Sequence, residues 1–110
     1  MGIRLLTWLL AFIFIGAGIP KVLGLEQAVE GFTHFGYSAW FRLFIGAAEI
    51  AGGIGLLIPS LTRMAAVGLL AIMAGAIWTL WSVGESPLPP LVIGGMLAAR
   101  IGLGSSATRD

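Results

Sequence analysis

One acidic residue, Glu49, has the greatest potential for chemistry in this sequence, because it stands in a long apolar stretch. Residues 41–58 contain no charged residue besides Arg42 and Glu49. About 20 mostly apolar residues cross a bilayer as a helix, and a charge near the bilayer centre costs at least about 2.5–3.5 kcal/mol. We therefore expect the Glu49 side chain to face other helices, where its carboxyl group is either protonated or paired with a cation.

Few polar residues are available to such a buried carboxyl group. Positions 42, 46, 49, 52/53 and 56 share one helix face, so Glu49 points along a groove lined by glycine. Lys21, at the end of the first apolar stretch, is the first candidate partner. It lies above Glu49 by roughly 10 Å, which a long side chain, a kink at Pro20 or a water molecule can bridge. The further candidate partners in this buried polar cluster are Arg42, His34, Trp78 and Thr79.

The cluster has three interpretations. It is an ion pair or hydrogen-bond network that fixes how the helices pack, a polar site in mid-membrane that binds a small amphiphile or carries a proton, or a contact to a partner subunit. The sequence contains no cysteine and a single histidine, which excludes thiolate and multi-histidine metal sites and CxxC redox chemistry. We predict no metal site and assign no catalytic residue.

The composition predicts an integral membrane protein. Hydrophobic residues make up 58% of the 110, with 17 glycines in addition, and charged residues make up 10%, against about 25% in a typical soluble domain. So little charge cannot cover the surface of a small soluble monomer. A net charge of +1 without a basic patch excludes nucleic acid as a partner. The expected partner is the lipid bilayer.

Four apolar stretches are long enough for membrane spans, at residues 5–23, 41–58, 64–84 and 87–104. The short connections between the later spans require neighbouring helices to be antiparallel. We therefore predict an all-α integral membrane protein, an antiparallel four-helix transmembrane bundle that forms a single domain over residues 1–110. Residues 25–38 are expected to form a short amphipathic segment at the membrane surface between helices 1 and 2.

The distribution of cationic residues predicts the orientation. Four spans place both termini on one side, which then carries four arginines, whereas the other side carries Lys21 and Arg42. The positive-inside rule places both termini in the cytoplasm, in a multi-pass protein of the cell (cytoplasmic/inner) membrane. One of the four arginines, Arg100, lies within the fourth stretch and is expected to extend toward the lipid headgroups.

Small residues recur at helical spacing in the second, third and fourth stretches, and the first contains Gly16, Ala17 and Gly18. In lipid, such residues let helix backbones approach closely. A second small face would leave room for a homo-oligomer or a membrane protein partner. The predicted packing positions are Gly18, Gly46, Gly52, Gly53, Gly75, Gly94 and Ala98.

Three segments together resemble the DoxX-like (DoxX/DoxD) family of small four-helix membrane proteins. Gly18-Ile19-Pro20-Lys21 looks like the family's G-x-x-K at the end of the first helix, and Gly36-Tyr37 resembles its aromatic lead into the second. The run from Arg42 to Leu57 is similar to the family's glycine-flanked glutamate in helix two. The resemblance covers nearly the whole chain and transfers the family's polar pair onto Lys21 and Glu49.

The resemblance implies a protein of bacterial or archaeal cytoplasmic membranes. Some family members resemble subunits of quinone-linked oxidoreductases of sulfur compounds, or redox-associated membrane complexes. Relatives with a strongly polar residue in helix three differ from this chain, which has Trp78-Thr79-Leu80-Trp81 there. The leading hypothesis is an accessory or structural subunit of a redox-associated membrane complex, in which the Lys/Glu cluster organises the bundle. The alternatives are an oxidoreductase subunit that binds quinone, the candidate cofactor, or another small amphiphile, and a small oligomeric carrier or proton pathway.

Overall fold

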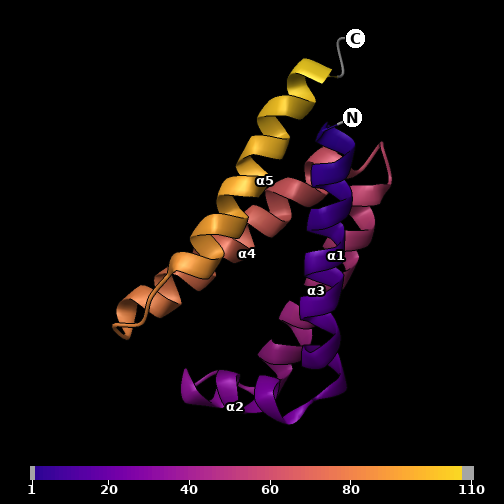
Figure 1. Ribbon diagram of the computed structural model, residues 1–110. Helices are drawn as coiled ribbons and strands as arrows, with labels where there is room; N and C mark the ends of the chain where they lie inside the picture. The colour runs from indigo at the N-terminus through magenta and orange to yellow at the C-terminus, as the bar shows by residue number, and fades with distance from the viewer. Residues whose placement is uncertain (1, 108–110) are drawn as a thin grey trace.

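The computed structural model describes residues 2–107, and the side chains of residues 2–103. Over that range every regular element is a helix, as Figure 1 shows, and the predicted all-α fold class is confirmed. The four long helices fall on the four expected spans, with bounds that differ by a few residues. The elements are α1 (Gly2–Leu23), α2 (Glu26–His34), α3 (Ala39–Leu57), α4 (Thr62–Ser82) and α5 (Leu88–Ala107).

Three of these helices, α1, α3 and α4, are long and apolar enough to cross a membrane. The fourth long helix, α5, is apolar over Leu88–Leu103, the part whose side chains the structure describes. The Ser86 hydroxyl accepts a hydrogen bond from the backbone N–H of Leu88 at 3.3 Å and so caps the start of α5. Because α5 is not among the three helices long and apolar enough over their described residues, a fourth membrane crossing stays a prediction.

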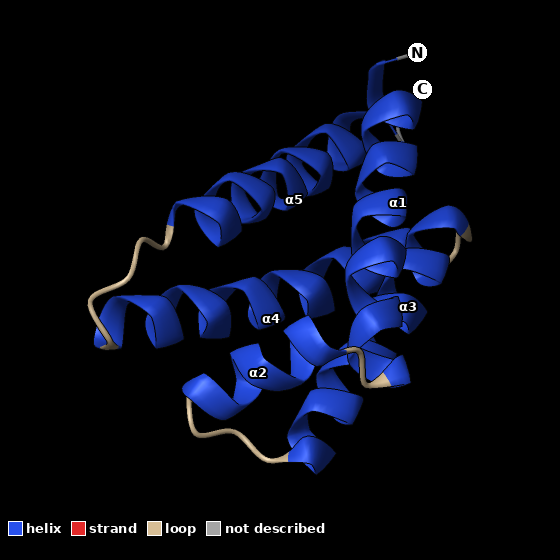
Figure 2. Cartoon of the chain, turned by 60° about the horizontal axis from the view of Figure 1, so that its bottom comes forward, coloured by secondary structure: helices blue, strands red, loops and turns tan. Residues whose placement is uncertain are grey.

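The long helices form two antiparallel pairs (Figures 1 and 2). In one pair α1 lies along α3, and in the other α4 lies along α5. The second pair runs obliquely to the first, so the helices splay apart at the end where α2 lies. The arrangement thus departs from an antiparallel four-helix bundle with a single axis. The start of α1 and the last described turns of α5 lie at the same end of the molecule (Figure 1).

The distribution of small residues along α3 explains the splay. In the second half of α3, a Cβ atom added to Gly52 would lie 2.6 Å from Leu69 Cδ2 of α4, and one added to Gly55 would lie 3.0 Å from Ala65 Cβ. The first half presents the larger side chains of Phe41, Ile45 and Glu49 toward α4. Because close approach needs small residues, α4 packs on the second half of α3 and diverges from the first.

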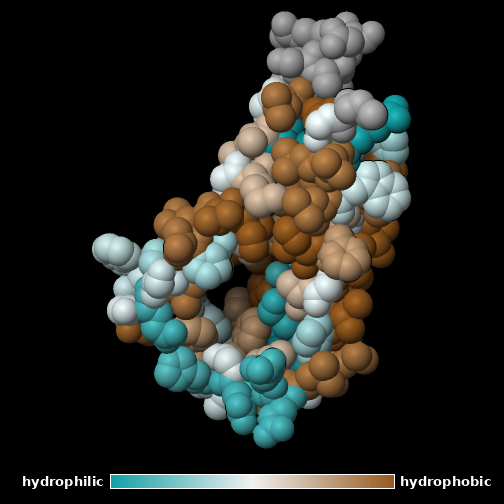
Figure 3. Space-filling model, in the orientation of Figure 1, coloured by the Kyte–Doolittle hydropathy of each residue, from teal (hydrophilic) through white to brown (hydrophobic). Residues whose placement is uncertain are grey.

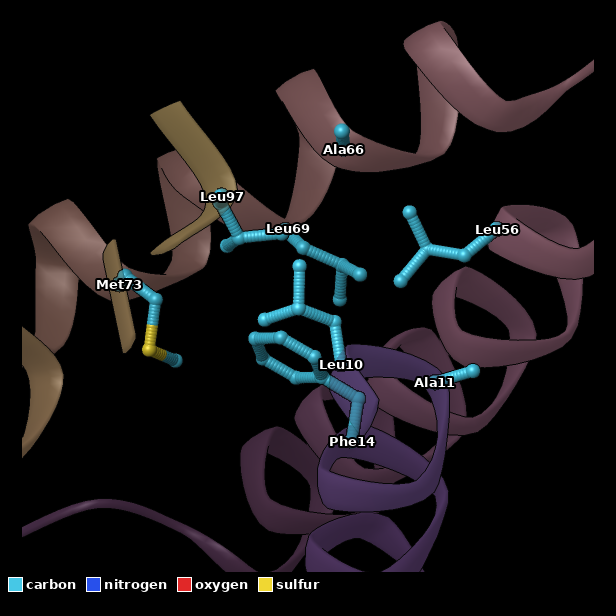
Figure 4. Packing of buried hydrophobic residues seen from close by; sticks show 8 residues of the cluster. All are labelled: Leu10, Ala11, Phe14, Leu56, Ala66, Leu69, Met73 and Leu97. Atoms are coloured by element: carbon cyan, nitrogen blue, oxygen red, sulfur yellow. The ribbon is translucent and has the colours of Figure 1, made fainter. Parts of the chain in front are cut away.

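The apolar core lies at the end where the pairs meet, as the close-up in Figure 4 shows. Leu10 and Phe14 of α1 point toward Leu69 of α4 and Leu97 of α5. All eight core residues are at most 7% exposed: Leu10, Ala11, Phe14, Leu56, Ala66, Leu69, Met73 and Leu97. Since such packing holds membrane helices together, the core fixes this end and leaves the α2 end to other interactions.

A polar contact joins α5 to α1 at the core end. The Nε–H of Arg100 donates to Thr7 Oγ1, and the Thr7 hydroxyl donates in turn to the Ile3 carbonyl oxygen at 2.7 Å. Arg100 is half-buried. Its Nε atom therefore bonds within the protein, whereas the sequence predicted that this side chain extends to the lipid headgroups.

Candidate functional site

Lys21 and Glu49 form an ion pair between α1 and α3. Lys21 Nζ lies 2.6 Å from Glu49 Oε1, and the two side chains are 22% and 4% exposed. Lys21 Nζ also donates to the Ala17 carbonyl oxygen, one turn earlier in α1, at 3.2 Å. The acid predicted to face other helices thus lies inside the protein with a cation beside it.

A glycine on α3 allows this pairing. A Cβ atom added to Gly46 would lie 2.7 Å from Lys21 Cβ and 3.0 Å from the Gly18 carbonyl oxygen. The end of α1 can therefore rest on α3 one turn before Glu49. From that position the lysine side chain reaches the carboxylate along the helix face.

The ion pair forms part of the wall of a cavity of about 620 Å³. The cavity lies between α2, the first half of α3 and the second half of α4, where the two pairs diverge. Figure 3 shows the molecule hollowed in this region, above the hydrophilic surface of α2. Among the described lining residues Lys21 and Glu49 carry charge, and most of the others are apolar. A volume of about 300–1,000 Å³, apolar with a few polar groups, is typical of small-molecule sites.

The other four predicted members of the cluster have different positions. The Arg42 guanidinium donates to the Lys21 carbonyl oxygen, not to Glu49. His34 Nε2 lies 3.1 Å from Glu85 Oε2, and the Thr79 hydroxyl hydrogen-bonds the Tyr37 hydroxyl at 2.6 Å. Trp78 is 68% exposed but contributes to the cavity wall. The structure thus places Thr79 and Trp78 in the cavity wall with the ion pair. Arg42 does not line the cavity but bonds the α1 backbone at Lys21.

Aromatic residues of the segment between α1 and α3 line the cavity as well, and they were not among the residues predicted for the site. The Tyr37 ring centroid lies 4.8 Å from that of Phe41 and 6.0 Å from that of Phe32. Phe35 completes this wall. The spacing of Ala28, Phe32 and Phe35 is a sequence signal for one helix face, but it does not show that the face covers a cavity.

The predicted packing positions fall into three groups. Gly18, Gly46, Gly52 and Gly53 lie where a Cβ atom would come within 3.0 Å of a neighbouring helix. Gly94 has ordinary contacts, with Met73 Cβ at 3.6 Å from its added Cβ. Gly75 has nothing within 4 Å, and Ala98 is exposed. Within the described residues, no group of three or more His, Cys, Asp or Glu could hold a metal ion.

Arg42 of α3 bonds the end of α1 that carries Lys21, and this contact gives a first prediction. Arg42 is 9% exposed, and its guanidinium bonds a carbonyl at the carboxyl end of α1, where helix carbonyls lack partners. We expect Arg42→Met to lower the free energy of unfolding by about 1.5–3 kcal/mol, the range for a hydrogen bond to a charged group. Thermal unfolding in detergent, followed by tryptophan fluorescence, measures the loss.

Two control variants test this role of Arg42. Arg63→Met changes an exposed arginine in the first turn of α4 and should leave the unfolding temperature unchanged. Arg42→Lys keeps the charge but lacks the planar fork of the guanidinium, so it should give an intermediate loss. Equal unfolding temperatures for Arg42→Met and Arg63→Met would show that the contact adds nothing to stability.

Long apolar helices around a buried ion pair and a cavity define a helical membrane protein, and sequence comparison gives its family. Residues 5–101 match the DoxX-like family. The chain is also 36% identical over 72 residues to the Bacillus subtilis (strain 168) protein named "Uncharacterized protein YdgD"; this match covers 62% of the chain and 63% of that relative. No solved structure matches. The chain belongs to the DoxX-like family.

Proposed function

We propose that this protein binds a small membrane-dissolved amphiphile in the cavity beside the Lys21–Glu49 pair. The observation that carries the proposal is the position of this pair, which is the charged part of an otherwise mostly apolar wall. A buried ion pair that serves packing alone needs no adjacent space. Here about 620 Å³ of space adjoins the pair.

The chemistry of the wall indicates the ligand class. A lysine ammonium has three N–H donors, and within the described residues Lys21 Nζ has two partners, Glu49 Oε1 and the Ala17 carbonyl. The third N–H can donate to a carbonyl or hydroxyl oxygen of a ligand. The phenylalanine rings and the aliphatic side chains of α4 would enclose an apolar ring or tail. A quinone has these features and is one candidate ligand, together with other neutral amphiphiles.

The remaining interpretations receive different support. The role of an accessory or structural subunit in a redox-associated membrane complex is compatible with the ion pair, and a ligand cavity does not exclude it. A carrier or proton pathway needs polar groups on both sides of Glu49. Beyond Glu49, toward the core end, α3 packs through Gly52 and Gly53 against Leu69 and Ile15, which favours a dead-end cavity over a pathway.

The membrane placement belongs to the same proposal. We expect four crossings of the cytoplasmic membrane with both termini in the cytoplasm. The start of α1 and the last described turns of α5 lie at one end of the molecule, which supports an even number of crossings (Figure 1). The α2 end would then face the opposite side of the membrane.

A binding experiment tests the proposed ligand site. Protein purified under gentle solubilisation is expected to carry a bound amphiphile, detected by native mass spectrometry and by analysis of the organic extract. We expect Ala76→Phe, which fills the cavity from α4, to reduce the retained ligand at least about tenfold, since a bulky ring occupies its volume. Native mass spectrometry also gives the subunit count, and so tests for a homo-oligomer.

The matched control for this test is Ala74→Phe. Ala74 lies two residues away on α4, is exposed, and does not line the cavity. This variant should retain the ligand as the unmodified protein does. Extracts without any amphiphile, together with no stabilisation by an added short-chain quinone or monoacylglycerol, would contradict a binding function.

A further inference from the structure

The segment between α1 and α3 crosses the splayed end of the cavity. We call residues 24–38, which include α2, the strap. The beginning and the end of the strap are held together, because Arg42 in α3 donates to the Lys21 carbonyl oxygen at the end of α1. No residue of α2 is buried, although Gln27, Ala28, Gly31 and Phe32 line the cavity. The strap therefore forms one wall of the cavity without being part of a packed core.

The backbone of α2 lies apart from that of α4. No Cα atom of α2 comes within 8 Å of a Cα atom of α4, and both helices lie wholly in the described range. Two polar contacts join the strap to the end of α4 and to the connection after it: the Tyr37 and Thr79 hydroxyl groups at 2.6 Å, and His34 Nε2 with Glu85 Oε2 at 3.1 Å. His34 and Glu85 are 66% and 47% exposed, and exposed pairs of this kind contribute little stability.

Two glycines provide positions at which the strap can change direction. Gly24 and Gly36 have φ angles of 71° and 79°, in the left-handed region that favours glycine. A Cβ atom added to Gly36 would meet nothing within 4 Å, so the backbone conformation and not packing calls for glycine there. On its other side, the strap is held to α3 by the contact of Phe32 with Phe41, whose ring centroids are 6.2 Å apart.

We propose that the strap is a hinged lid, attached at α1 and α3 and latched to α4 by Tyr37–Thr79 and to the connection between α4 and α5 by His34–Glu85. Closed, the lid separates the cavity and the Lys21–Glu49 pair from water at the membrane surface; open, it connects them. The benefit of such a lid rests on the proposed amphiphile site, since it would keep an apolar ligand in a dry cavity. The opening itself can be measured without any ligand.

The absence of cysteine from the sequence allows a direct test by thiol labelling. Ala76→Cys places a thiol in the cavity wall. The protein is reconstituted into lipid nanodiscs, in which both membrane faces are accessible and lipid covers the sides. A charged maleimide can then reach this thiol from water only past the strap, whereas the uncharged N-ethylmaleimide also reaches it through the lipid.

We expect breaking the latch to expose the introduced thiol. Tyr37→Phe removes the hydroxyl but keeps the ring that contacts Phe32 and Phe41, and His34→Ala removes the second contact. Together these changes should raise the labelling rate with the charged maleimide about five- to tenfold, as the loss of one or two weak contacts implies. Thr79→Val should reproduce the effect of Tyr37→Phe, and the two together should add nothing further, because they remove the same bond.

Two controls separate opening of the lid from unfolding. The N-ethylmaleimide rate at Ala76→Cys should rise much less than that of the charged reagent, because N-ethylmaleimide already reaches the thiol through the lipid, whereas unfolding would raise the rates of both reagents alike. A thiol introduced by Ser82→Cys, at an exposed position of α4, should react equally in all backgrounds. The lid is disproved if the charged reagent labels Ala76→Cys equally fast with and without the latch. This outcome is distinct from a missing ligand, which would contradict the proposed function and not the lid.

Discussion

Replacing Lys21 with methionine is expected to destabilise the protein more than the other single changes at the ion pair. The change leaves the Glu49 carboxylate, whose side chain is 4% exposed, without its cation. Removing one partner of a buried ion pair typically costs about 3–5 kcal/mol. Because Lys21 is 22% exposed, we expect a loss near the lower end of that range. Thermal unfolding in detergent, followed by the fluorescence of the four tryptophans, measures the change.

The complementary change, Glu49→Gln, should cost less. The lysine left behind keeps its bond to the Ala17 carbonyl and its partial exposure, so its charge is not stranded. Its expected loss is about 1–3 kcal/mol, the cost of a lost hydrogen-bond partner. An unfolding temperature equal to that of the unmodified protein would refute the structural role of the carboxylate.

A double variant separates structure from binding. Lys21→Met/Glu49→Leu removes both charges and fills their volume with apolar atoms, a replacement that is often neutral or stabilising for buried ion pairs. We expect its stability to return to within about 1 kcal/mol of the unmodified protein, while the retained amphiphile is lost. A double variant that is stable and still carries its ligand would restrict the pair to organising the helices.

The ion pair shows which parts of a site a sequence can predict. Glu49 was expected to face inward because of its depth in an apolar stretch, and Lys21 was the first of its candidate partners, with Arg42 and His34 as others. Both inferences depend on one helix and its direct neighbour, which are in contact along most of their lengths. Helical periodicity and the cost of a charge in lipid are sufficient for such arguments.

The cavity, by contrast, depends on the angle between the two helix pairs. That angle follows from where α4 can approach α3: close at Gly52 and Gly55, and distant at Phe41 and Ile45. Small residues along the whole sequence predicted close packing, but Gly75 has nothing within 4 Å of an added Cβ atom. Spacing within a helix cannot show which of its small residues meet a partner.

The partners of the polar side chains near the strap could also not be predicted from the sequence. Thr79 and His34 were candidates to contact Glu49, but they bond Tyr37 and Glu85. These pairings depend on the course of the strap, which turns at Gly24 and Gly36. A connection of this kind is positioned by tertiary contacts, and helical periodicity gives no information about its path.

A methyl group at the α1–α3 contact is expected to lower the stability of the protein and to disturb the candidate site as well. A Cβ atom added to Gly18 would lie 2.5 Å from the Gly46 carbonyl oxygen and 2.7 Å from Ile50 Cγ1. The nearer atom belongs to the backbone and cannot rotate away, so the two helices must separate. We expect Gly18→Ala to cost about 1–3 kcal/mol, as overpacking typically does, and Gly46→Ala a similar amount. Their effects should not add, because both changes separate the same pair of backbones.

Gly16→Ala is the matched control on the same helix. Gly16 has nothing within 4 Å of an added Cβ atom, and alanine favours a helix over glycine by about 0.8–1.0 kcal/mol in water. This variant should therefore unfold at the same temperature as the unmodified protein or slightly higher. If Gly16→Ala and Gly18→Ala lost equal stability, the loss would come from the change of residue type and not from the contact between α1 and α3.

The overpacking introduced by Gly18→Ala should also alter the geometry of the candidate site. Gly46 packs against Lys21. Any separation of α1 from α3 therefore moves the Lys21 ammonium group relative to Glu49 Oε1, which is 2.6 Å away. Gly18→Ala should therefore reduce ligand retention as well as stability, whereas Gly16→Ala should change neither. A Gly18→Ala variant that is destabilised but retains its amphiphile fully would show that the ligand does not depend on the distance between the two charges, and the proposed contact with Lys21 would be wrong.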